Sequence, residues 1–183
     1  TLGQFRQWLY KVAKVVSNSV STQSNFIVLK RGLAQQLGKD IGVVDPSNGV
    51  VGIVTDVSDN YAVVMSLLHK DSRISAKLKK SGDAGMIIWD GKYPNELTLI
   101  DIRKSAKIAK GDSVVTSGFT TTFPYGLLIG TVEEVWLEKS SNNFTIKLKS
   151  AVNFYNLQYV YAIDNLEKNE INRLLEKAKK EIQ

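Results

Sequence analysis

The sequence contains no cysteine, one histidine and three prolines in 183 residues. The absence of cysteine excludes disulfide bonds, thiolate zinc sites and thiol nucleophiles. With His69 as the single histidine, a transition-metal site is not expected either. No run of about 18 apolar residues occurs, so nothing in this sequence is expected to span a membrane. We therefore predict no metal site and no cofactor.

The composition is that of an ordinary globular protein, with 43% hydrophobic and 23% charged residues. It suits one large all-β domain or two small ones. The net charge of +6 could attract nucleic acid, anionic lipid or an acidic protein face. This charge is spread thinly, and the densest positive stretch lies between Lys70 and Lys80.

An apolar stripe marks the first 24 residues, which are predicted to form a helix. Its members follow one another at alternating spacings of three and four, as at the a and d positions of a coiled coil. They are Leu2, Phe5, Leu9, Val12 and Val16. The stripe predicts self-association through the end of a coiled coil, and a helix that caps a barrel is the alternative.

From Asn25 onward the apolar residues alternate with a period of two, which predicts strands. About a dozen short strands, separated by turns such as 46–49 and 58–60, indicate a β-sandwich or β-barrel. Asp164-Asn165 then supplies an N-cap, and residues 166–182 are predicted to form a helix.

Two segments of the β region resemble each other. Residues 52–57, Gly-Ile-Val-Thr-Asp-Val, are echoed 78 positions later by 130–135, Gly-Thr-Val-Glu-Glu-Val. A turn and a strand follow each copy, and a glycine inside a strand often marks a bulge or corner of a small barrel. We therefore predict a mainly β fold with two small six-stranded barrels in tandem.

The predicted domain boundaries follow from these elements. The N-terminal helix takes residues 1–24 and the first barrel 25–71, which the strand 158–163 could complete. The second barrel takes 72–157 and the C-terminal helix 164–183.

One motif imitates an enzyme. Gly111-Asp112-Ser113 resembles the nucleophile segment of chymotrypsin-like proteases, and His69 lies upstream as in those enzymes. That fold needs glycines after the serine to form the oxyanion hole, whereas Val114 and Val115 follow here and favour a strand interior. No phosphate loop, dinucleotide fingerprint or nucleophile elbow occurs. The sequence therefore predicts no catalytic residues and no enzyme.

Three stretches resemble the family of the rod shape-determining protein MreC. They are Val43 to Tyr61, with Pro46-Ser-Asn-Gly-Val-Val-Gly52; Asp71 to Gly85, with Asp71-Ser-Arg-Ile74; and Gly111 to Val132, with Phe123-Pro-Tyr-Gly126. The resemblance covers about residues 24–163. It departs from the family pattern at 119–122, where a glycine-rich turn is common, and at Tyr125, where a second proline is common.

The resemblance implies a non-catalytic scaffold of the cell-elongation complex, with two barrels outside the cytoplasm. It implies a homodimer or filament and a class B penicillin-binding protein, the transpeptidase of wall synthesis, as partner, together with other membrane proteins of the rod complex. It also implies the periplasmic face of the bacterial inner membrane, with a single-pass N-terminal anchor that is missing from this sequence.

Two aromatic stretches are candidate partner-binding sites. The first contains Phe119, Phe123, Pro124 and Tyr125, and the second contains Phe154 and Tyr155. Large rings at a protein surface are typical binding hot spots, whereas rings that fill the junction of the barrels would be structural. Both interpretations stay open.

A β-barrel that binds nucleic acid is the alternative function. Such sites interleave aromatic and basic residues on one face, whereas residues 70–80 contain no aromatic residue. The scaffold is therefore favoured, and no nucleic-acid partner is expected.

Overall fold

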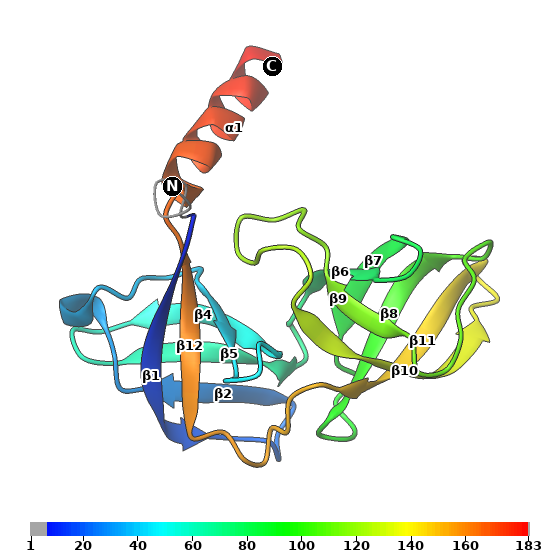
Figure 1. Ribbon diagram of the computed structural model, residues 1–183, viewed down its shortest axis with the longest axis horizontal. Helices are drawn as coiled ribbons and strands as arrows, with labels where there is room; N and C mark the ends of the chain where they lie inside the picture. Colours follow the sequence, from blue (N-terminus) through cyan, green and yellow to red (C-terminus); the bar gives the residue numbers. More distant parts are fainter. Residues whose placement is uncertain (1–6, 183) are drawn as a thin grey trace.

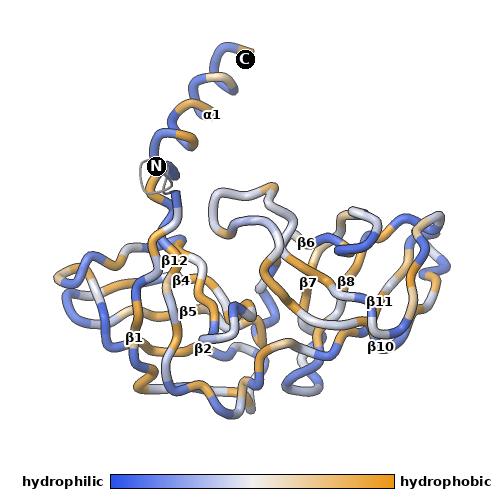
Figure 2. The backbone as a smooth tube through the Cα atoms, in the orientation of Figure 1, coloured by the Kyte–Doolittle hydropathy of each residue, from blue (hydrophilic) through white to orange (hydrophobic). Residues whose placement is uncertain are grey.

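The structure of the protein, a computed structural model, describes residues 7–182 and shows two closed β-barrels side by side, with one helix that projects away from them (Figure 1). Hydrophobic residues run along the strands of both barrels (Figure 2). Their buried members form the core, with Leu29 and Val64 inside the first barrel and Leu99 and Leu148 inside the second.

Six strands in the order β1-β12-β3-β4-β5-β2 close the first barrel, and all neighbours are antiparallel. They are β1 (Trp8–Asn18), β2 (Ser24–Leu29), β3 (Gly42–Val44), β4 (Val50–Val57), β5 (Ala62–His69) and β12 (Tyr159–Asn165). A short 3₁₀ helix, η2 (Leu33–Gln35), lies between β2 and β3. β12, which follows the second barrel in the sequence, thus lies between β1 and β3 and completes the first barrel.

The second barrel contains the six strands between β5 and β12, in the order β10-β11-β8-β7-β6-β9. They are β6 (Ile74–Leu78), β7 (Ala84–Ile88), β8 (Glu96–Arg103), β9 (Ser113–Thr116), β10 (Leu128–Leu137) and β11 (Asn143–Ser150). The two six-stranded barrels confirm the predicted mainly β fold with two barrels.

The internal repeat corresponds to equivalent strands of the two barrels. Gly52 on β4 and Gly130 on β10 each face a neighbouring backbone: a Cβ would lie 2.1 Å from the Met65 carbonyl oxygen in one and 2.4 Å from that of Lys149 in the other. The register shifts at the same offset in both, between Val54/Asp56 and between Val132/Glu134. Only glycine permits this close approach, so the repeated residues mark matching bulged corners.

The predicted N-terminal helix is wrong over residues 8–18, which form β1; residues 1–6 lie outside the described residues. Burial along β1 follows a period of two, with Lys11 and Ala13 buried and Tyr10 and Val12 exposed. β1 pairs with β12 and β2, and these long-range hydrogen bonds override a local spacing that also fits a helix. The aromatic and β-branched residues of β1 favour the strand as well.

The predicted C-terminal helix is present as α1 (Lys168–Ile182). Over these described residues none is buried, and hydrophobic and hydrophilic residues alternate along the projecting helix (Figure 2). Leu166 N–H donates to the Gln7 carbonyl, so the chain enters and leaves the first barrel at the same end.

Candidate functional site

The long connection between β9 and β10, residues 117–127, is called the junction loop because it reaches across to the first barrel (Figure 1). The Thr116 hydroxyl donates to the Pro124 carbonyl at 2.6 Å and accepts from the Leu127 N–H at 2.9 Å. On the other barrel, the Asn165 side-chain amide donates to the Thr121 carbonyl at 2.9 Å. The loop is therefore fixed at both its base and its far side.

Phe123 points from the junction loop into the space between the barrels. Its side chain is 3% exposed, and its ring lies against Gly42 of β3. Gly42 pairs with Ile163, which is also buried. Phe123 thus covers part of the outer face of the first barrel, as the structural interpretation of this ring predicts.

Phe119 and Tyr125 lie on the opposite, solvent side of the same loop. They are 68% and 58% exposed, and the Lys77 ammonium lies 4.0 Å and 5.8 Å from their ring centroids. A cation over an aromatic face is attracted by the ring quadrupole. Phe119, Tyr125 and Lys77, called the loop patch, therefore form one amphipathic surface.

Lys77 was not predicted as a site residue. It lies on β6, which pairs with β9 through Lys77 and Val115, so the lysine reaches the loop only in the folded barrel. No local sequence signal connects residue 77 with residues 119 and 125. Only a prediction of the β6–β9 pairing could have found it.

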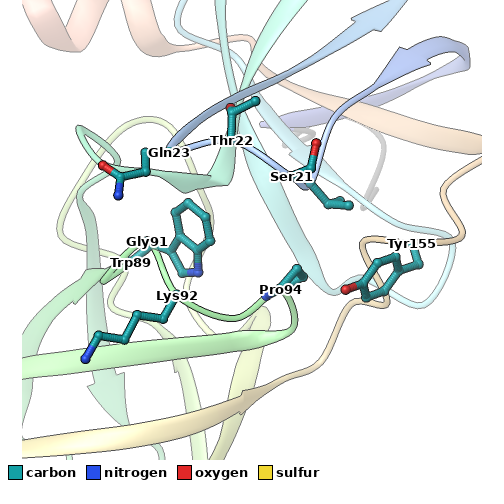
Figure 3. A pocket seen from close by; sticks show the side chains of 9 residues that line it. Ser21, Thr22, Gln23, Trp89, Gly91, Lys92, Pro94 and Tyr155 are labelled. Carbon is teal, nitrogen blue, oxygen red and sulfur yellow. The ribbon is translucent and has the colours of Figure 1, made fainter.

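The second predicted aromatic stretch lies on the other side of the junction. Phe154 is fully buried, and its N–H donates to the Asn95 side chain at 2.9 Å. Tyr155 is 65% exposed and borders a cleft of about 500 Å³ between the barrels (Figure 3). The wall opposite Tyr155 contains Gln23 from the first barrel and Trp89 from the second.

The six predicted partner-binding residues therefore do not form one surface. Phe123 and Phe154 are buried, and Pro124 is partly buried. The junction loop, with the exposed rings Phe119 and Tyr125, and the β11–β12 connection, with Tyr155, lie at opposite ends of the junction (Figure 1).

The predicted self-association stripe is divided by the strand geometry. Val12 and Val16 are 50% and 47% exposed, Leu9 is partly buried, and Leu2 and Phe5 lie outside the described residues. Val12 pairs with Tyr161, whose ring lies 5.9 Å from that of Tyr10. Tyr10, Val12, Tyr159 and Tyr161 form an outward patch on β1 and β12, called the strand patch.

The residues that imitate a protease lie in different barrels. His69 ends β5, is 4% exposed, packs edge-on against Phe26 and accepts the Asp71 N–H. Ser113 begins β9, where its carbonyl accepts the Lys79 N–H. Across residues 7–182, no three His, Asp or Glu side chains gather closely enough to hold a metal ion. In the same residues, no helix has both the length and the apolar character to cross a bilayer.

Comparisons with known proteins agree on one family. The family model "Rod shape-determining protein MreC, barrel core" matches residues 15–164. The cell shape-determining protein MreC of Listeria monocytogenes is 31% identical over 153 residues, which are 81% of this chain and 51% of that protein. The chain spans about half the length of the curated relatives it matches.

Solved structures show the same fold. An MreC structure from Listeria monocytogenes has a TM-score of 0.79 at 29% identity, over 87% of this chain and 77% of that chain. The major periplasmic domain of "the cell shape-determining filament MreC" has a TM-score of 0.75 at 19% identity, over 88% and 98%. A complex of penicillin-binding protein PBP2 and MreC from Helicobacter pylori gives 0.67 at 23% identity, over 87% and 99%. The last two show likeness of fold alone.

Proposed function

This chain belongs to the MreC family, and we propose that it is a non-catalytic scaffold that self-associates and positions a penicillin-binding transpeptidase to maintain cell shape. Relatives are named cell shape-determining proteins, and the MreC of Helicobacter pylori forms a complex with PBP2. We place the barrels in the periplasm, tethered to the inner membrane by an N-terminal anchor. The periplasmic domain of a structural neighbour supports this place.

The loop patch is the proposed contact with the transpeptidase, and its exposed rings are the observation that carries this assignment. Two large rings, each more than half exposed, sit on a loop that is anchored on both barrels. Rigid, exposed aromatic side chains are enriched at binding hot spots because they bury a large area at low entropic cost. Lys77 adds a donor and a positive charge between the rings.

The buried ring of Phe123 in the same loop supports this assignment. Phe123 holds the loop against the first barrel, so the positions of Phe119 and Tyr125 depend on both barrels together. A partner that binds the loop patch would therefore recognise the assembled two-barrel unit. Tyr155, in the connection between β11 and β12, is proposed as a second contact with the transpeptidase.

The test is a binding measurement with the ectodomain of a class B penicillin-binding protein from the same organism. We expect the double variant Phe119→Ser/Tyr125→Ser to bind at least tenfold more weakly and to melt at the native temperature. Tyr61→Ser, which removes a 46% exposed ring from the first barrel, is the matched control and should bind normally. Unchanged binding by the double variant would refute this contact.

A further inference from the structure

A small groove lies on the outer face of the second barrel. It contains no residue of the loop patch, and it shares Lys92 with the cleft beside Tyr155. It has a volume of about 230 Å³, and β10, β11 and β8 form it together with the loop from Asp90 to Asn95. Its walls combine two aromatic rings with both acidic and basic side chains. Those used in the argument are Tyr93, Glu96, Glu134, Trp136 and Lys147.

The two rings of the groove are accessible. Trp136 on β10 is 45% exposed and Tyr93 is 62% exposed, whereas Trp89, at the base of the Tyr93 loop, is 5% exposed. An accessible indole or phenol ring offers a flat, electron-rich face that is attracted to C–H groups and cations.

The charged groups that line the groove carry both signs. The Lys147 ammonium lies 3.0 Å from the Glu96 carboxylate, and Lys147 is also the cross-strand partner of Glu134. The Lys147 side chain on β11 is 30% exposed, and the Glu96 side chain on β8 is 32% exposed. Because the chain supplies its own cation between two carboxylates, the groove offers alternating acceptors and donors rather than a strong negative field.

The loop that presents Tyr93 is held in place from behind. The Trp89 indole N–H donates to the Tyr93 carbonyl at 3.0 Å, and the Asn95 carbonyl accepts the Ser150 N–H at 2.9 Å. Both anchors lie outside the groove, so the backbone of the loop that carries Tyr93 is held in place before any ligand arrives. Preorganisation of this kind lowers the entropic cost of binding.

We propose that this groove binds one sugar unit of an oligosaccharide. A pyranose presents C–H groups on its faces, which suit the Trp136 and Tyr93 rings, and hydroxyls around its rim that both donate and accept hydrogen bonds. The row Glu96–Lys147–Glu134 supplies partners of both kinds. The volume is below the range of about 300–1,000 Å³ that suits drug-sized ligands, so a single ring fits and the rest of the glycan lies outside. This proposal goes beyond the scaffold function and does not depend on it.

The test is a calorimetric titration of the whole chain with two probes, the hexamers of β-1,4-linked N-acetylglucosamine and of β-1,4-linked glucose. We expect saturable binding of at least one hexamer, with little dependence on salt. Trp136→Ala and Tyr93→Ala should each weaken it at least tenfold, whereas Tyr61→Ala, a control ring on the first barrel, should leave it unchanged. Circular dichroism melts check that the variants are folded.

Two results would overturn the proposal. They are no saturable binding of either hexamer, and binding that survives both Trp136→Ala and Tyr93→Ala. Neither of these results bears on the loop patch, since the two surfaces share no residue.

Discussion

The ring of Phe123 lies so close to the backbone of Gly42 that a Cβ on the glycine would be 2.4 Å from the ring Cε1. Phe123 belongs to the second barrel and Gly42 to β3 of the first. The absence of a side chain at position 42 therefore allows the junction loop to pack on the first barrel. Three further contacts cross the junction: the bridge between Gly49 and Leu128, the Asn165 bond to Thr121, and the Asn18 amide, which donates to the Phe154 carbonyl at 2.8 Å.

Gly42→Ala should destabilise the protein by overpacking this contact, at a cost of about 1–3 kcal/mol. The measurement is a thermal or urea denaturation curve. Gly38→Ala is the matched control, because nothing lies within 4 Å of a Cβ at that glycine. Equal melting temperatures for the two variants would contradict the tight fit at Gly42.

Phe123→Ser should cost about 3–5 kcal/mol, the range for removal of a buried phenylalanine ring. Phe119→Ser, from the same loop, should stay within about 0.5 kcal/mol of the native chain because its ring is 68% exposed. Urea denaturation of both variants gives the comparison. A similar loss of stability in both would mean that Phe119 also anchors the loop.

The sequence predicted the barrels better than it predicted the site. The repeat was visible because Gly52 and Gly130 each face a backbone that leaves no room for a Cβ. Such a position requires glycine, and this requirement can be seen in the sequence. The C-terminal helix was visible because its periodicity is local. Its predicted cap was wrong, because Asp164 and Asn165 end β12, where the Asn165 side chain accepts the Glu167 N–H at 3.0 Å, and the helix begins at Lys168.

The orientation of the aromatic residues depends on contacts between residues that are distant in the sequence. No local sequence pattern therefore indicates which rings are buried. Phe119 and Phe123 are four residues apart, and only the packing on Gly42 decides which of them is buried. The error at the N-terminus has the same origin. Lys11 points inward because it meets Asp164, which lies 153 residues away, and that pairing leaves no trace in the spacing of Leu9 and Val12.

Asp83 should make the stability of the second barrel depend on pH in the acidic range. A hydrogen bond from Ser81, with further help from the Arg103 guanidinium, lowers the pKa of the Asp83 carboxyl in the folded protein. A folded-state pKa below the unfolded value of about 3.9 adds stability above that pH, and this stability is lost as the pH falls through the folded pKa. Below about pH 4, the melting temperature of the native chain should therefore fall more steeply than that of Asp83→Asn. Parallel curves for the two proteins would contradict this role.

Lys11→Met should destabilise the first barrel, although it replaces a charge with an apolar side chain. The Lys11 ammonium is 2.9 Å from Asp164 and also donates to the Gln36 carbonyl, so the change leaves two acceptors without their donor. We expect a loss of stability of about 1–3 kcal/mol, the usual cost of leaving a buried polar group unsatisfied. The loss is no larger because Asp164 is 26% exposed and its carboxylate still reaches water. Lys14→Met, at an exposed position of the same strand, is the control and should be near neutral in urea denaturation. Adding Asp164→Asn to Lys11→Met should recover part of the loss.

Val12→Glu should weaken self-association of the chain. Val12 lies at the centre of the strand patch, where two copies that met through this face would bring two carboxylates together in a desolvated contact. A point change is the suitable test because β1 is a strand of the first barrel, so deletion of the N-terminal residues would open the barrel itself. Leu33→Glu, at a 55% exposed position on η2, is the matched control. In analytical ultracentrifugation we expect the native chain and Leu33→Glu to associate as the protein concentration rises. Val12→Glu should remain a monomer up to a concentration at least tenfold higher than the one at which the native chain associates. A native chain that stays monomeric throughout, or a Val12→Glu variant that associates as the native chain does, would show that the strand patch is not the contact.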